Sequence, residues 1–182
     1  MRKAFSQLFQ KKSTSKELSD YLRWRNGIFT ITAAQVGVLT DQPNQVYGVI
    51  MDVGLSDEFT ITVTAFPTGE SSLMTTIGGG VIGLGSNEFI ADHAKHIVMV
   101  AQSIITTARP INTHDLPKSQ KVYFYLLTTS GLMLSETTLE EIFSNVAPKE
   151  IASPIYIFRE MFARFSEIKR RSEELTIAHR KG

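Results

Sequence analysis

The chain has 182 residues, of which 42% are hydrophobic and 20% charged, and its formal net charge is +1. This length and composition predict one folded domain over residues 1–182 and argue against disorder of the whole chain. No apolar run approaches the roughly 18 residues that cross a bilayer, so we expect no membrane span. The lack of cysteine excludes disulfides and thiol nucleophiles and, with no signal-peptide pattern, favours a cytoplasmic protein.

The charge distribution argues against nucleic-acid binding, because such domains are usually strongly basic as a whole. Only the two ends are locally basic. At the C-terminal end, Glu167, Glu173 and Glu174 interleave with Lys169, Arg170, Arg171, Arg180 and Lys181. This pattern predicts a solvated, self-compensating tail from about residue 169 that frays or projects from the domain.

The N-terminal part reads as helical. Phe5, Leu8 and Phe9 have helical spacing, which predicts a first helical region over residues 4–9. The run Thr14–Glu17 matches a capping box and predicts the start of a second helix. Residues 26–40 alternate like a strand at first and then suit a short helix, so their type stays open.

Three strands are predicted next, over residues 45–53, 59–65 and 71–77. Short turns join them, which favours an antiparallel meander. In the second strand, threonines alternate with apolar residues, so we expect one half-exposed face.

A broad apolar face over residues 87–108 predicts a central buried helix, which Arg109–Pro110 ends. Two further strands, over residues 121–127 and 132–134, flank the turn Thr129–Gly131 and predict a hairpin.

Two helices are predicted after the hairpin. The run Thr137–Glu140 resembles a capping box, and Pro148 is the expected end of the helix that it begins. Ser153 and Pro154 then match a cap and first helical position, and apolar residues follow at helical spacing as far as Ile168.

Together these elements predict an α+β fold. We expect a two-layer sandwich with a mainly antiparallel sheet of about five strands, covered on one face by N-terminal, central and C-terminal helices. The order of elements is similar to that of profilin-like and secretion-chaperone-like folds, and no residue motif of the chain supports a family assignment.

A glycine-rich segment between the third strand and the central helix is the first candidate site. Free backbone N–H groups at the helix entrance would bind phosphate or carboxylate. The alternative is a tight connection, which the acidic Glu88 and Asp92 and the missing P-loop lysine favour. The predicted ligand-binding residues are Gly78, Gly79, Gly80, Gly83, Gly85 and Ser86.

A histidine pair in the central helix is the second candidate site. His93 and His96 lie one turn apart, a spacing that allows both to bind a metal such as zinc. A third ligand would have to come from His114 or Asp115. The alternative is that both are boundary residues hydrogen-bonded to neighbours.

The chain lacks a G-x-S-x-G elbow and an H-E-x-x-H motif, and its sequence implies no cofactor. A noncatalytic protein-interaction or adaptor domain is therefore the leading interpretation, with another protein or a second copy in a homodimer as the partner. The alternatives are binding of a small anionic ligand at the glycine-rich segment and a metal-dependent enzyme that uses His93 and His96.

Overall fold

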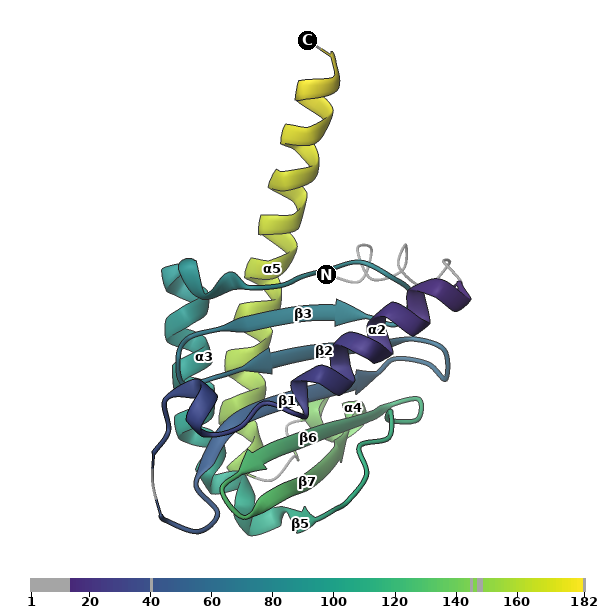
Figure 1. Ribbon diagram of the computed structural model, residues 1–182. Helices are drawn as coiled ribbons and strands as arrows, with labels where there is room; N and C mark the ends of the chain where they lie inside the picture. The colour runs from purple at the N-terminus through teal and green to yellow at the C-terminus, as the bar shows by residue number, and fades with distance from the viewer. Residues whose placement is uncertain (1–13, 40, 145, 147–148, 182) are drawn as a thin grey trace.

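The computed structural model describes residues 14–39, 41–144, 146 and 149–181. In this part of the chain one antiparallel sheet of seven strands, in the order β4-β3-β2-β1-β6-β7-β5, carries helices on both faces (Figure 1). The elements are α2 (Ser15–Ile28), η1 (Ala34–Val36), β1 (Val46–Gly54), β2 (Thr60–Ala65), β3 (Ser71–Thr75), β4 (Gly80–Val81), η2 (Leu84–Ser86), α3 (Glu88–Ala101), η3 (Gln102–Thr107), β5 (Arg109–Pro110), β6 (Lys121–Thr128), β7 (Gly131–Thr138), α4 (Leu139–Phe143) and α5 (Lys149–Lys181).

Two antiparallel blocks make the sheet, and the α+β class is confirmed. The β1–β3 meander and the β6–β7 hairpin join where β1 pairs with β6, with Val49 opposite Leu126. The expected count of about five strands is wrong, because β4 and β5 add a two-residue strand at each edge. Strands this short have no alternating pattern, so the sequence does not reveal them.

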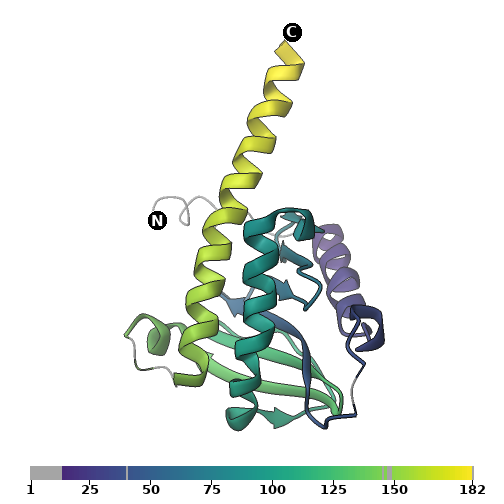
Figure 2. The same ribbon diagram turned by 90° about the vertical axis from the view of Figure 1, so that its left-hand side faces the viewer.

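The helices lie on two faces of the sheet, so the two-layer arrangement is also wrong. α3 and α5 pack side by side on one face, and α2 crosses the opposite face (Figure 2). The reason lies in β1, where Val49 faces α3 while Ile50 and Asp52 point the other way and are equally buried. All six residues of β2 are buried as well, so the half-exposed threonine face is not found.

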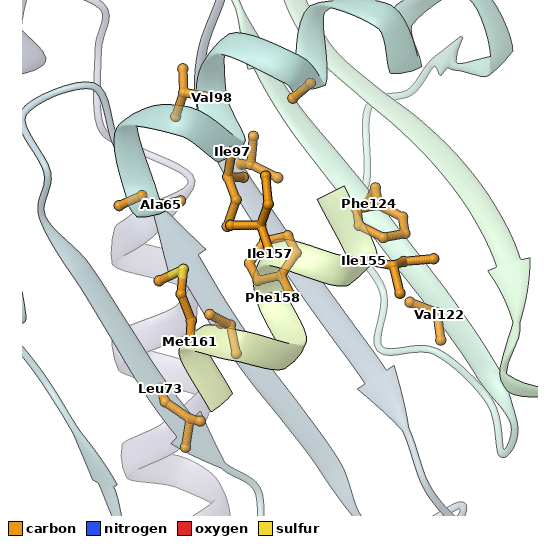
Figure 3. Packing of buried hydrophobic residues seen from close by; sticks show 14 of the residues in the cluster. Ala65, Leu73, Ile97, Val98, Val122, Phe124, Ile155, Ile157, Phe158 and Met161 are labelled. Atoms are coloured by element: carbon orange, nitrogen blue, oxygen red, sulfur yellow. The ribbon is translucent and has the colours of Figure 1, made fainter. Parts of the chain in front are cut away.

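The main core fills the space between the sheet and the α3–α5 layer (Figure 3). Ile97 of α3, Phe158 and Met161 of α5 and Phe124 of β6 meet there, and all four are buried. The rings of Phe124 and Phe158 lie 6.2 Å apart, within the usual range of aromatic pairs. The apolar stripes predicted for the central and final helices therefore face this core.

Side chains fix where two helices begin. Thr14 caps α2 in a capping box with Glu17, as predicted. The box that begins α4 consists of Thr138 and Glu141, one residue later than predicted, and Thr137 also bonds the Glu141 carboxylate at 2.7 Å.

The central helix changes type near its end. α3 stops at Ala101, and residues 102–107 form the tighter helix η3, where an α-helix to residue 108 was predicted. The hydroxyls of Thr106 and Thr107 each donate to the carbonyl three residues earlier. β-branched residues with this bonding fit a tight terminal turn better than a regular α-helix.

Two further segments are compared with their predictions: the segment of undecided type before the first strand, and the final helix. Of the segment predicted over 26–40, the described residues 26–39 finish α2 and form η1, with no strand among them. α5 begins at Lys149, before the predicted cap, so Pro154 lies inside its second turn. Its C-terminal part continues as helix and stands out from the domain (Figure 1). The helical region predicted over 4–9 lies outside the described residues.

The main core predicts how two neighbouring positions of α5 respond to truncation. We expect Phe158→Ala to lower the free energy of unfolding by about 3–5 kcal/mol, because the side chain is 1% exposed and leaves a cavity. Tyr156→Ala is the control, with a change within about 0.5 kcal/mol, because Tyr156 is 62% exposed. Urea unfolding followed by circular dichroism measures both, and equal losses would contradict this packing.

Candidate functional site

The glycine-rich segment makes a tight connection from β3 to α3. Gly78 and Gly79 have φ values of 84° and 83°, which few other residues adopt without strain. A side chain on Gly80 would overlap the carbonyl oxygen of Leu73 on the paired strand. At these positions the glycines are required by the backbone path itself.

Two carboxylates lie against the same segment. A side chain at Gly78 would meet the Glu17 carboxylate of α2, and one at Gly85 would meet the Glu70 carboxylate. Both carboxylates would repel a bound phosphate, and Glu88 adds a third negative charge in the first turn of α3. This electrostatic environment favours the connection over the anion site, and ligand binding there stays a prediction.

The histidine pair lies on α3. The Nδ1 of His93 donates to the carbonyl of Phe89 at 2.8 Å, and the two rings stack with centroids 4.0 Å apart. His96 is exposed on the same helix. Neither of the two suggested third ligands is near, because His114 and Asp115 contact α2 on the other face of the sheet.

Among residues 14–39, 41–144, 146 and 149–181, no three His, Asp or Glu side chains are grouped as a metal would require. The bonded and stacked ring of His93 matches the alternative interpretation of a boundary histidine. A metal site at His93 and His96 stays a prediction.

The most developed polar cluster lies between α2 and the sheet, and sequence analysis did not find it. Arg25 of α2 and Asp52 of β1 are 2% and 0% exposed. The Nε and Nη2 atoms of Arg25 donate to Asp52 Oδ2 at 2.9 and 2.6 Å. We call this pair and its hydrogen-bonded neighbours the Arg25–Asp52 cluster. Because both side chains are buried away from water, each charge is stabilised by the other.

Hydroxyl groups complete the cluster on the side of β2. Thr62 donates to Asp52 Oδ1 at 2.5 Å, and the Tyr21 hydroxyl lies 2.6 Å from Thr62 Oγ1. Because the Thr62 proton is used, Tyr21 is the donor in this second bond. Burial raises the pKa of the Asp52 carboxyl, while Arg25 and Thr62 oppose that rise; burial also raises the pKa of Tyr21.

The loop between β5 and β6 closes the cluster at its other end. Arg25 Nη1 donates to the His114 carbonyl at 2.6 Å, and the Tyr125 hydroxyl donates to the Asp115 carbonyl. The Arg25 guanidinium also lies over the rings of Phe29 and Tyr125, 4.9 and 5.4 Å from their centroids. Each guanidinium nitrogen thus has an acceptor within the protein. The cluster therefore attaches α2 to the sheet and is not arranged as a ligand site.

A shallow pocket of about 410 Å³ opens beside this cluster. It lies between the C-terminal end of α2 and the same loop, and its lining is Leu22, Arg25, Asn26, Asn112, Thr113, His114, Asp115 and Leu116. The carboxylate of Asp115 is already near the Thr113 hydroxyl, at 3.4 Å. The lining combines polar residues with Leu22 and Leu116, it is open to solvent, and its side chains form no convergent catalytic set.

One signal in the sequence marks the missed pair. Asp52 is the single charge within the apolar strand Val46–Gly54. A charge in such a run is buried only with a partner. The sequence does not indicate which Lys or Arg is that partner, because Arg25 lies on a helix of mostly polar residues.

Comparisons with family models, with curated proteins and with solved structures found no match. Within the described residues, no helix combines the length and the apolar character that crossing a membrane requires.

The glycine geometry predicts unequal effects of two alanine substitutions. We expect Gly80→Ala to destabilise the protein more than Gly83→Ala, because its methyl group meets the Leu73 backbone whereas Gly83, at φ 73°, faces open space. For Gly83→Ala we expect a loss of about 1 kcal/mol from backbone strain alone. Thermal unfolding of both variants is the measurement, and a larger loss for Gly83→Ala would refute the tight-connection interpretation.

Proposed function

We propose that this chain is a noncatalytic protein-interaction module that self-associates through the C-terminal part of α5. The main support for this proposal is that α5 continues as a helix beyond the sheet and α3, against which its first part packs (Figure 2). We call residues 169–181 the arm. The proposal names a second copy of this chain as the partner.

The arm follows the part of α5 that packs on the main core. Phe165 is buried, and Ile168, one turn further, is still packed against the core. At 1.5 Å per residue, the remaining helix extends about 20 Å. The docked part of α5 nucleates this helix, but most of a helix's stability in proteins comes from tertiary contact along one face. A docking partner would supply that contact.

Charge favours a second copy as that partner. Residues 14–168 contain ten Lys and Arg and sixteen Asp and Glu, a net charge of −6. Residues 169–182 contain five Lys and Arg and two Glu, a net charge of +3. The arm of one copy is therefore complementary to the body of another, whereas two arms repel each other. We expect contact between arm and body rather than pairing of arms.

The proposal predicts a salt-sensitive oligomer that depends on the arm. Light scattering after size-exclusion chromatography should give a dimer or larger species for the full chain and a monomer for a chain that ends at residue 168. Arg171→Glu combined with Arg180→Glu, which keeps the length, should also shift the equilibrium to monomer. High salt should do the same, because it screens the attraction.

The matched control is Arg159→Glu, which changes an exposed charge on the docked part of α5. We expect the oligomer of this variant to match that of the full chain. A monomer at every concentration tested would reject self-association. An oligomer unaffected by truncation or by charge reversal would reject the arm as its basis.

A further inference from the structure

The two faces of the sheet are covered by helices of opposite character. α3 buries six apolar residues, including Ile90, Ile97 and Val98. α2 is polar over most of its length and buries only Tyr21 and Arg25. Both of these reach the sheet through polar atoms, to Thr62 and Asp52. α2 is therefore attached mainly by the Arg25–Asp52 cluster.

The chain that follows α2 covers a separate group of apolar residues. Phe29, Ile31 and Val36 pack on five buried side chains of the α2 side, which we call the second core: Ile50, Phe66, Tyr125, Leu127 and Leu134. The hydroxyl of Tyr47 also donates to the Ile31 carbonyl at 3.1 Å. Residues 15–38 thus form one continuous cover over this face (Figure 1).

We propose that residues 15–38 form a detachable strap, fastened by the Arg25–Asp52 cluster, which opens while the sheet, α3 and α5 stay folded. Opening uncovers the second core as an apolar surface. This inference does not depend on the proposed function, because it concerns the opposite face of the sheet from α5.

The main core explains why the domain survives opening. None of its buried residues and none of the partly buried residues packed against it comes from residues 15–38. The sheet and the α3–α5 layer keep all of these contacts when the strap leaves. Regions with few buried apolar contacts open locally at lower free energy than the core, which is the expected behaviour of α2.

The stability of the closed strap depends on one pair of charges. In the closed state Arg25 and Asp52 compensate each other's desolvation, and in the open state water hydrates both. Removing one partner disturbs only the closed state, since the other charge then stays buried without compensation. The cluster is thus the contact that sets the fraction of open molecules.

Hydrogen exchange of the unmodified chain tests the proposal first. We expect the amides of α2 to exchange through an opening with a smaller dependence on urea than the larger unfolding that exposes the amides of α3. Trp24, the single tryptophan of the chain, lies on α2 with its ring 6.3 Å from that of Tyr21. Its fluorescence should change at lower urea than the circular dichroism of the domain.

Variants then test the fastening. Asp52→Asn should speed exchange of the α2 amides at least about tenfold, because hydrogen bonds to charged groups are lost. The α3 amides should accelerate by no more than the same factor, because the closed state is the reference for both openings. The control is Asp20→Asn, which also changes a residue of α2. Asp20 pairs with Lys16 and Arg23 at 2.7 and 2.9 Å, and these ion pairs are exposed to solvent. We expect less than about a twofold change there.

Two results would overturn the strap. One is exchange of α2 and α3 amides together in the unmodified chain, with the same urea dependence. The other is an Asp52→Asn variant whose α2 amides exchange no faster than those of the unmodified chain. If Asp52→Asn fails to fold, the exchange of the unmodified chain still decides between a strap and a single cooperative unit.

Discussion

Burial of both faces of the central strands is the constraint on which this structure depends. Pairing of β1 with β6 joins the meander to the hairpin and places these two strands in the middle of the sheet. Both strands carry buried apolar side chains on each face, such as Val49 and Ile50 of β1, which require cover on both sides for full burial. The cover on one side is the α3–α5 layer and on the other the segment 15–38. The three-layer arrangement follows from that requirement.

The two covers achieve burial by different interactions. Apolar packing is nondirectional and tolerates small shifts, so the α3–α5 layer can hold a helix as long as α5 against the sheet. A buried ion pair with hydrogen-bonded neighbours is directional, and it fixes one position of α2. Stability is therefore unevenly distributed over the molecule. The α2 face holds the polar groups, and the α3–α5 face holds most of the apolar core.

The glycine-rich segment and the arm of α5 illustrate how a sequence pattern can suggest more than one role. Glycines favour an anion site only where free N–H groups meet a positive environment. Here the backbone path needs the glycines, and carboxylates of Glu17 and Glu70 lie beside them. The basic residues after Ile168 looked self-compensating in isolation. Beside a body of net charge −6 they become the complement of another copy.

Local patterns are enough to predict the α+β class, the meander, the hairpin, the apolar face of α3 and the Thr14 capping box, because each rests on periodicity or on residues three or four apart. The two edge strands, the second helical layer and the pairing of Arg25 with Asp52 emerge only in the folded chain. These depend on pairing between segments far apart in the chain, and a two-residue strand or a single buried charge does not specify its partner. The same reason separates His114 and Asp115 from His93: the topology assigns them to opposite faces of one sheet.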